Sequence, residues 1–437
     1  MLTDHRIRGG FVAAAAVACT FVMTPMHAAA AKQNANSPAY VADHVLVGYS
    51  KVTTAAQRHA VERRVGAHEI GSYGVGGRLL QVRAGTVRSA IAGLESAPGV
   101  RYAEPDFVEE PSAVTNDPSF PLQWSLRNTG QVVNGVKGKP GADVHATAAW
   151  DVTTGSHSIV IAEVDSGIDY THPDLAANIW TNPGGVGGCP AGTHGYNTVA
   201  GNCDPMDDFG HGTHVAGIMG AVGNNRRGIT GIEWRASLMP VKFINAKGSG
   251  TDFRLLKALD WVIAAKDAGV NVRVVNDSGT WVNTGYSQAV RDELSMLAAH
   301  DILFVTAAGN SRSNNDTTPR YPCSYGAPNE ICVAATNQRD RLAGFSNYGV
   351  KTVDLAAPGD NVYSTLPGGT YGYMKGTSMA SPMVAATAAL VLAQQDMSTS
   401  ALKSDILNNV DPLTTLAGEV ATGGRLDTCK AVPGCAG

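Results

Sequence analysis

After residue 117, short apolar runs alternate along most of the chain with segments in which apolar residues recur at helical spacing. Five short runs are almost continuously apolar, and they lie at 159–164, 237–243, 272–275, 302–306 and 331–335. Such runs are typical of parallel strands that helices cover on both faces. Between them, apolar residues recur at helical spacing, as in Leu255, Leu259, Val262 and Ile263, and in Val290, Leu294 and Leu297. The pattern predicts an α/β fold with a doubly wound, mostly parallel sheet, and it directs attention to the carboxyl ends of the strands.

A second pattern precedes this one and predicts a small separate domain at residues 43–110. Its expected strands lie at 43–49, 78–82 and 100–108, and its expected helices at 53–65 and 86–97. The second helix is amphipathic, since Val87, Ile91 and Leu94 share one face. We interpret the order as β-α-β-β-α-β, which is the ferredoxin-like α+β arrangement.

Residues 1–31 are expected to form a secretory signal peptide. Arg6 and Arg8 supply the positive region, residues 11–23 are an apolar stretch short for a membrane span, and 28–31 offer small residues for cleavage. The alternatives are a retained membrane anchor or a lipid on Cys19, although the branched aliphatic residue expected three places before that cysteine is missing. We therefore expect a secreted protein with no membrane anchor after processing.

Composition and charge narrow the classes of function. Hydrophobic residues make up 44% of the 437-residue chain and charged residues 16%, below the usual share of about 25%. The formal net charge is −4 and no run of Lys and Arg occurs. These values favour a large, well-buried enzyme, and they argue against a nucleic-acid groove or binding to an anionic membrane surface.

The cysteines agree with export into an oxidising compartment. Six remain after the signal peptide, and six cysteines allow about 15 pairings in principle. Because they fall into neighbouring pairs around short segments that contain Gly or Pro, we predict the disulfides Cys189–Cys203, Cys323–Cys332 and Cys429–Cys435. A zinc site would need CxxC-type spacing, which the chain lacks.

Three distant segments carry the parts of a nucleophilic catalyst. They are Val164-Asp165-Ser166-Gly167, the seven residues His211 to Gly217 (HGTHVAG), and the seven residues Gly376 to Pro382 (GTSMASP). A Ser/His/Asp triad occurs in several chain orders, and the order Asp, His, Ser is that of subtilisin. With Ala308-Gly309-Asn310 between the second and third segments, the chain resembles the subtilisin family of secreted serine proteases along residues 43–430.

The resemblance implies a role for each candidate catalytic residue. Ser378 would be the nucleophile at the start of a buried helix, and its own N–H would donate to the oxyanion. His211 would be the general base and Asp165 its carboxylate partner, with Asp169 a weaker candidate for that place. Asn310 would supply the second oxyanion donor from its side-chain amide.

Several of these residues have alternative interpretations. Gly-Thr-Ser can be an ordinary helix cap, and Asn310 a turn residue. His211 and His214, with Asp165 as a third ligand, raise the possibility of zinc. Metalloprotease helices, however, usually place their histidines four apart with a Glu between, so we expect His214 to be a packed, hydrogen-bonded side chain.

The domain at 43–110 resembles the inhibitory propeptide of subtilisins, which assists folding and blocks the site. The alternative is a binding domain retained in the mature protein. The acidic linker that follows is expected to be cut between about 110 and 116, which leaves a catalytic domain at 117–437. The expected partners are this propeptide and polypeptide substrates, and we expect the mature enzyme to be a monomer.

Substrate binding in the family adds an extended peptide between two edge segments. The expected residues of this kind are Gly248, Ser249 and Gly250 on one edge, and Ser278 and Gly279 on the other. The second edge departs from the family pattern, in which a bulky residue and then Gly follow the Ser. Arg320 corresponds in position to the floor of the primary pocket and would favour an acidic or polar side chain there; a surface arginine is the alternative.

A structural Ca²⁺ is expected from the resemblance. Asp117, Asp174 and Asn225 match family positions for it, and backbone carbonyls near Gly223, Arg227 and Ile229 would complete the shell. The adjacent Arg226 and Arg227 suit a cation only if both point outward. A second ion among Asp204, Asp207 and Asp208 is an alternative to plain solvation of these acids.

The residues together predict a secreted serine endopeptidase made as a zymogen. The alternatives are an esterase or acyl transferase that uses the same triad, and a catalytically silent binding protein of the same fold.

Overall fold

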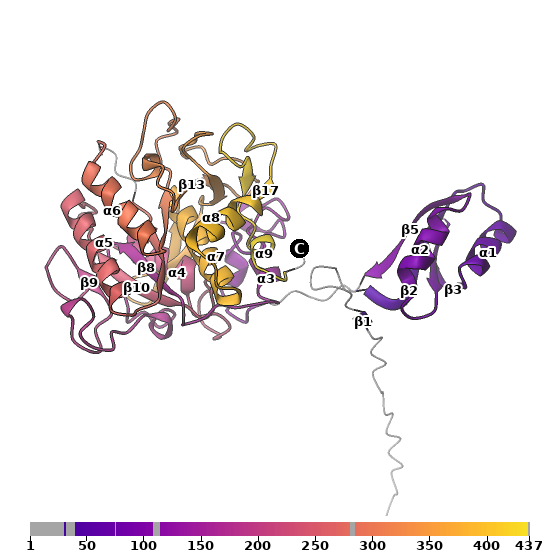
Figure 1. Ribbon diagram of the computed structural model, residues 1–437, viewed down its shortest axis with the longest axis horizontal. Helices are drawn as coiled ribbons and strands as arrows, with labels where there is room; N and C mark the ends of the chain where they lie inside the picture. The colour runs from indigo at the N-terminus through magenta and orange to yellow at the C-terminus, as the bar shows by residue number, and fades with distance from the viewer. Residues whose placement is uncertain (1–29, 32–39, 75, 108–113, 280–284, 436–437) are drawn as a thin grey trace, which may run out of the picture. The chain divides into compact units, whose positions relative to one another are not determined.

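The computed structural model describes residues 30–31, 40–74, 76–107, 114–279 and 285–435. They belong to two compact units, Met1–Glu109 and Glu110–Gly437, and Figure 1 shows the elements of each. The predicted signal peptide lies outside the described residues apart from 30–31, and so does most of the predicted processing segment.

The N-terminal unit is a twisted antiparallel sheet with two helices. Its elements are β1 (Ala30–Ala31), β2 (Tyr40–Tyr49), α1 (Ala55–Arg64), β3 (His68–Tyr73), β4 (Gly77–Gln81), α2 (Val87–Glu95) and β5 (Val100–Phe107). β2 pairs with both β4 and β5, and β3 pairs with β4. Val87 and Leu94 of α2 are buried against the sheet, while Ile91 is half-buried. β3 is the strand that the hydrophobic pattern did not locate, because its side chains are nearly all exposed.

The second unit is built on a nine-stranded sheet in the order β17-β18-β14-β13-β12-β11-β8-β10-β9. Its strands are β8 (Val160–Asp165), β9 (Tyr196–Asn197), β10 (Ser237–Lys242), β11 (Val272–Asp277), β12 (Leu303–Ala307), β13 (Glu330–Thr336), β14 (Leu355–Pro358), β17 (Asp411–Pro412) and β18 (Gly424–Arg425). Every pairing is parallel except that of β17 with β18. The five predicted apolar runs form the central strands β8 and β10–β13, and every residue in these strands is buried.

Helices cover both faces of this sheet (Figure 1). One apolar cluster joins the sheet to α4 (His211–Gly220), α7 (Thr377–Gln394) and α8 (Thr399–Asn408), and another joins it to α5 (Asp252–Asp267) and α6 (Gln288–Ala299). α7 is long and apolar enough to cross a membrane by length and composition, but 89% of it is buried inside the domain. It is therefore the central core helix, which explains its lack of a polar face.

Short elements complete the unit. They are α3 (Ala146–Ala149), α9 (Thr428–Ala431), the hairpins β6 (Val132–Val133)/β7 (Val136–Lys137) and β15 (Val362–Leu366)/β16 (Thr370–Met374), and the 3₁₀ turns Phe120–Leu122, Ala176–Asn178, Val186–Gly188 and Cys323–Tyr325. Three disulfides join the cysteine pairs 189–203, 323–332 and 429–435, which are the pairs that the sequence predicts.

Candidate active site

Asp165 and His211 meet where one strand ends and one helix begins. Asp165 is the last residue of β8 and is fully buried, and His211 is the first residue of α4. His211 Nδ1 lies 2.8 Å from both carboxylate oxygens of Asp165. A proton on Nδ1 leaves Nε2 as the basic nitrogen of the ring. Burial opposes a charged imidazole, but the Asp165 carboxylate outweighs burial and raises the pKa of His211 above its ordinary value.

Asp207 ties the start of α4 to the residue that follows Asp165. Its carboxylate accepts the Ser166 hydroxyl at 2.9 Å. It also accepts backbone N–H groups around the helix start, those of Phe209, Gly210 and Thr213, at 2.8–3.0 Å. A carboxylate at a helix N-terminus satisfies amides that lack partners within the helix and is favoured by the helix dipole. Asp207 therefore holds His211 in register with Asp165.

Lys242 supports the same junction from β10. Its buried ammonium donates to the Ser166 carbonyl and to the Asp208 carboxylate, both at 2.6 Å. For the alternative of a second ion among Asp204, Asp207 and Asp208, the structure gives two of these acids protein partners: Asp207 holds the helix start and Asp208 pairs with Lys242. Asp204 accepts a tyrosine hydroxyl at 2.8 Å instead.

Ser378 and Asn310 present two donors to one point. Ser378 is the second residue of α7, so its N–H is one of the unpaired amides at a helix N-terminus. The Asn310 side-chain oxygen accepts the Thr377 N–H at 2.8 Å, which leaves the amide nitrogen on the other side. A Cβ atom added to Gly376 would lie 3.4 Å from Asn310 Nδ2 and 3.5 Å from the Ser378 nitrogen. The absence of a side chain at Gly376 thus keeps open the space between the two donors.

These groups open into a cleft of about 760 Å³ that His211, Asn310 and Ser378 line together. The same cleft is lined by residues that the sequence interpretation did not assign to the site, among them Asn134, Val136, Arg339, Asp360 and Lys375. Asn134 and Val136 belong to the β6–β7 hairpin. The signal for that hairpin was present in the sequence, because Asn134-Gly135 between valines is typical of a two-residue β-turn.

His214 does not join His211 in a metal site. It is buried, and its Nε2 donates to the Gly372 carbonyl at 3.2 Å. Burial, followed by the nearby His211, lowers the pKa of His214 to about 3. Since His211 Nδ1 is used by Asp165, the zinc alternative is wrong and His214 is the packed histidine expected. Asp169 turns away as well, and accepts the Thr171 hydroxyl at 2.6 Å.

The predicted substrate-binding residues lie on separate segments. Asn245 and Ser249 close a turn by a backbone hydrogen bond of 3.0 Å, and Ser278 is buried where it accepts Asn276 Nδ2 at 2.9 Å. Arg320 is half-buried, and its N–H donates to Ser324 Oγ at 2.9 Å. Among the described residues that line the 760 Å³ cleft, none of the six predicted residues appears: Gly248, Ser249, Gly250, Ser278, Gly279 and Arg320.

The three predicted calcium ligands do lie together. Asp117 accepts the N–H groups of Asn224 at 2.8 Å and Asn225 at 2.9 Å, and Asn225 Nδ2 lies 2.7 Å from Asp174 Oδ1. Ile229 N–H donates to Asp174 at 2.9 Å. The two buried carboxylates offer oxygen ligands of the kind that Ca²⁺ prefers, while the Asn225 side-chain oxygen accepts the Arg227 N–H at 2.8 Å. Arg226 and Arg227 are exposed, as a nearby cation requires.

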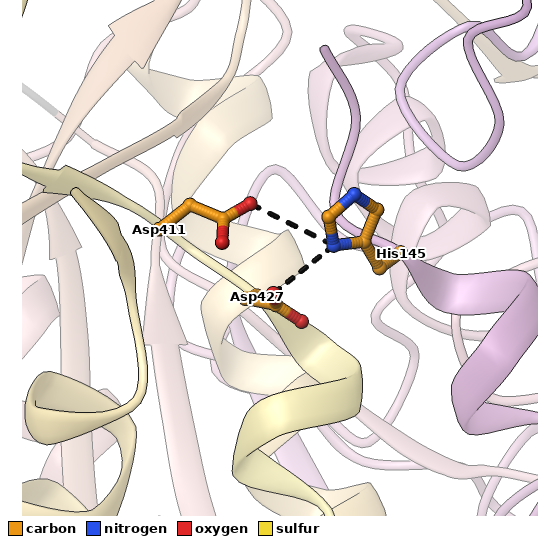
Figure 2. A group of neighbouring side chains, drawn as sticks. All are labelled: His145, Asp411 and Asp427. Atoms are coloured by element: carbon orange, nitrogen blue, oxygen red, sulfur yellow. Dashed lines mark hydrogen bonds and ion pairs between the residues drawn. The ribbon is translucent and has the colours of Figure 1, made fainter. Parts of the chain in front are cut away.

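A different group of possible metal ligands lies away from the cleft (Figure 2). Within the described residues, His145, Asp411 and Asp427 form the one such group. His145 Nδ1 lies 3.0 Å from Asp427 and 3.6 Å from Asp411. Arg425 also pairs with Asp411, and Lys430 pairs with both carboxylates. Because Arg425 and Lys430 already pair with these carboxylates, we interpret this group as an ion-pair network that joins α3, β17 and α9.

Glu163 is a buried carboxyl beside the triad that sequence reasoning missed. It lies two residues before Asp165 on the same strand, so the two side chains share a face of the sheet. It is fully buried, and neither carboxyl oxygen has a hydrogen-bond partner among the described residues. Burial and then Asp165 raise the pKa of Glu163 well above its ordinary value. An acidic residue within an apolar strand was the signal that marked it.

Comparisons with known protein families agree with this geometry. Residues 156–425 match the Subtilase family, and residues 27–106 match the fervidolysin N-terminal prodomain. The chain is 34% identical over 396 residues to a thermophilic serine proteinase of Bacillus sp. (strain AK1), and the match covers 90% of this chain and 88% of that protein. It is 38% identical over 289 residues to thermitase of Thermoactinomyces vulgaris, covering 66% of this chain and 93% of that protein.

Solved structures give the same result for the fold. A protease of Pseudoalteromonas arctica aligns with a TM-score of 0.60 at 25% identity, covering 73% of this chain and 99% of that one. A cold-adapted subtilisin-like serine proteinase aligns with a TM-score of 0.54 at 24% identity, covering 70% of this chain and 97% of that one.

Proposed function

The chain belongs to the subtilase family and is a serine endopeptidase with a prodomain, and we propose that Ser378, His211, Asp165 and Asn310 carry its chemistry. The observation that supports this assignment most directly is the pair of 2.8 Å contacts from His211 Nδ1 to Asp165, in a cleft that Ser378 and Asn310 also line. The expected esterase and silent binding-protein alternatives have no support in the comparisons.

The proposed reaction begins at the Ser378 hydroxyl. His211 Nε2 takes the hydroxyl proton while Ser378 Oγ attacks the carbonyl carbon of the peptide bond. The resulting oxyanion accepts hydrogen bonds from the Ser378 N–H and from Asn310 Nδ2. His211 then gives its proton to the departing amine, which leaves an acyl-enzyme on Ser378. Water then attacks the acyl carbon while His211 Nε2 takes one of its protons, and His211 returns that proton to Ser378 Oγ as the acyl–oxygen bond breaks and the acid product leaves.

Asp165 acts through His211 in this scheme. Its carboxylate fixes the tautomer with the proton on Nδ1 and stabilises the imidazolium that forms when Nε2 takes the serine proton. The buried position of Asp165 strengthens this interaction, because the surrounding dielectric is low.

We propose a zymogen with a signal peptide at 1–31, an inhibitory propeptide at 43–110 and a catalytic domain at 117–437. Thr115 and Asn116 contribute hydrogen bonds to the loop at 224–226, since Asn224 N–H donates to Thr115 Oγ1 at 3.0 Å and Arg226 N–H donates to Asn116 Oδ1 at 2.8 Å. These contacts support a cut before Thr115, in the earlier part of the predicted segment. Secretion is supported by the disulfides, and we expect the mature enzyme to be monomeric.

We also propose that Asp117, Asp174 and Asn225 hold a structural Ca²⁺. The ion would stabilise the loop at 223–229 and its contact with the start of the catalytic domain. It would take no part in the reaction, because these residues do not line the cleft that contains Ser378.

The test is purification of the wild type and of Ser378→Ala, followed by intact mass and casein hydrolysis. We expect the purified wild type to have its N-terminus between residues 110 and 115 and to digest casein. Ser378→Ala should keep its propeptide and be inactive. If both proteins were trimmed alike and neither digested casein, another protease would do the trimming and the assignment of Ser378 would be wrong. An ester substrate assayed in parallel separates an endopeptidase from an esterase.

A further inference from the structure

The catalytic cleft has a wall that the triad does not use. Beyond His211, Asn310 and Ser378, its lining includes Asn134 and Val136 of the β6–β7 hairpin together with Arg339, Asp360 and Lys375. These residues come from four segments of the chain that line the same cleft as the nucleophile. The proposed reaction at Ser378 does not use these residues, so they are available to bind the substrate.

The hairpin is held in place by side-chain hydrogen bonds. Asn134 Nδ2 donates to Asn361 Oδ1 at 2.6 Å, and Asn361 Nδ2 donates to the Val133 carbonyl at 3.2 Å. Arg339 Nε donates to the Lys137 carbonyl at 3.1 Å. An isolated two-stranded hairpin is marginally stable in water. These anchors therefore make β6–β7 a defined surface of the cleft.

The β6–β7 hairpin has two valine side chains that are exposed to solvent. Val133 is buried, but Val132 is 65% exposed and Val136 is 38% exposed. Val136 lines the cleft, whereas Val132 does not belong to its described lining. A rigid apolar side chain at the rim of a catalytic cleft can pack against a bound peptide.

The position of this wall indicates which part of a peptide it meets. The family resemblance places the extended peptide along 248–250 and 278–279, and we assign the part before the scissile bond to these segments; none of these residues belongs to the described lining of this cleft. The wall is therefore assigned to the other side of Ser378, where the departing amine lies. Lys375 precedes Ser378 by three residues in the chain, and it lines the cleft together with Ser378 and Asn310.

The charges on this wall are mainly positive. Arg339 and Lys375 are exposed, while Asp360 is half-buried and is the one carboxyl group in the described lining. Lys137, on the hairpin strand that Arg339 contacts, adds a third exposed cation nearby. A cleft with this charge attracts side chains of the opposite sign.

We propose that the β6–β7 hairpin, Arg339 and Lys375 form the leaving-group side of the substrate cleft and favour peptides with a carboxylate side chain one or two residues after the scissile bond. The proposal rests on the proposed function, since it concerns the same Ser378. Each exposed cation is expected to contribute about a two- to fivefold preference, as is usual for solvent-accessible ion pairs.

The test uses the mature enzyme obtained by expressing the full-length chain. The substrates are peptides that are identical before the scissile bond. The residue one or two places after the bond is Glu, Gln or Lys, and kcat/KM is measured for each. The ratio of the Glu to the Lys peptide within one enzyme cancels any general change in activity or folded fraction. We expect a ratio above about five in the wild type, and a fall of about two- to fivefold in both Lys375→Glu and Arg339→Glu.

Matched controls separate the cleft wall from the general surface charge. Arg341→Glu reverses an exposed charge two residues from Arg339 but outside the described lining, and the ratio should stay as in the wild type. Val136→Asp should lower the ratio, whereas Val132→Asp on the same hairpin should not.

A wild-type ratio near one, or ratios unchanged in both charge reversals, would overturn the proposal. So would equal effects of Val136→Asp and Val132→Asp. Failure of the proposed function looks different, because the wild type would then hydrolyse none of the peptides.

Discussion

The side-chain oxygen of Asn310 accepts hydrogen bonds from both donors of Thr377, its N–H and its hydroxyl, in the residue immediately before the proposed nucleophile. The Thr377 N–H lies 2.8 Å from this oxygen and the Thr377 hydroxyl 3.0 Å. The two hydrogen bonds decide which way the amide faces, because its oxygen is used on one side and its nitrogen is left on the other. The helix start that carries Ser378 thus also orients the second oxyanion donor.

We therefore expect Asn310→Ala to lower kcat about 10²–10³-fold with a small change in KM, since the lost hydrogen bond strengthens in the transition state. Thr377→Val should lower kcat by about two- to tenfold, because it removes one of two orienting hydrogen bonds. Thr317→Val is the control, since its exposed hydroxyl donates to the nearby Asn314 carbonyl and neither residue belongs to the described lining of the cleft. Steady-state kinetics on one peptide substrate measures all three. Equal kcat values in Thr377→Val and the control would contradict this view of Thr377.

The ionisation of His211 should control how kcat/KM falls at acidic pH. The base must be neutral to accept the serine proton, and Asp165 raises the pKa of His211 after opposing burial is counted. Activity should therefore fall as pH drops through a value above 6.5, the ordinary histidine pKa. Asp165→Asn should lower kcat about 10⁴-fold and shift this limb downward. If kcat/KM of the wild type fell with a midpoint at or below pH 6.5, Asp165 would not outweigh burial in setting the pKa of His211.

Glu163 should cost stability as the pH rises. Its pKa is raised in the folded state, so the folded protein holds a proton that the unfolded chain releases above its ordinary pKa. Relative to Glu163→Gln, the wild type should lose about 1.4 kcal/mol of unfolding free energy per pH unit until Glu163 ionises in the folded state. Thermal unfolding of the matured enzyme, inactivated with a serine-directed inhibitor, is measured between pH 5 and 8.

In that experiment the Tm advantage of Glu163→Gln over the wild type should widen with pH. Parallel curves for the Glu163 variant and the wild type would mean that Glu163 is charged in the folded protein.

Calcium removal should destabilise the catalytic domain without changing its chemistry. At a free Ca²⁺ concentration of about 100 times Kd, a bound ion contributes about 2.7 kcal/mol to stability. Chelation should therefore lower Tm by several degrees in the wild type, because the Asp117 and Asp174 carboxylates would then repel each other. The readout is Tm of the inactivated enzyme with Ca²⁺ and with chelator.

Asp174→Asn should lose most of this response, and Asp204→Asn should keep it, since Asp204 lies outside the cluster. A full response in Asp174→Asn would place the ion elsewhere.

His145 should stabilise the C-terminal segment most at mildly acidic pH. Its hydrogen bond to Asp427 outweighs the opposing effect of burial and raises the pKa of His145. Its contribution is then fully present below about pH 6.5 and is lost as pH rises through the raised value. His145→Gln should lower Tm more at pH 5.5 than at pH 8.5, by a few degrees at most because the imidazole is partly exposed.

His157→Gln is the control for this prediction, because His157 Nδ1 faces the Ala236 carbonyl at 2.6 Å and the ring pairs with no carboxylate of the part of the chain that the structure describes. A Tm loss from His145→Gln that did not depend on pH would indicate packing as the cause.

The sequence by itself determined the local units of this protein. Continuous apolar runs identify the central strands because those strands are buried on both faces, and Val290, Leu294 and Leu297 identify the buried face of α6. The catalytic candidates are also local signals, since each stands in a short segment at a strand end or a helix start. Neighbouring cysteines paired as predicted because the short segments between them limit the partners within reach.

Only the tertiary structure decided what these units make together. The order of the strands, the direction of the Asn310 amide and the burial of Glu163 depend on contacts between segments far apart in the chain. The same holds for the cleft wall, where Asn134 meets Asn361, and for Asp207, whose contacts with the start of α4 the sequence did not predict. The physical reason is that residue type and spacing report the burial and periodicity of a segment, whereas the partner of a polar group depends on which segments pack against it.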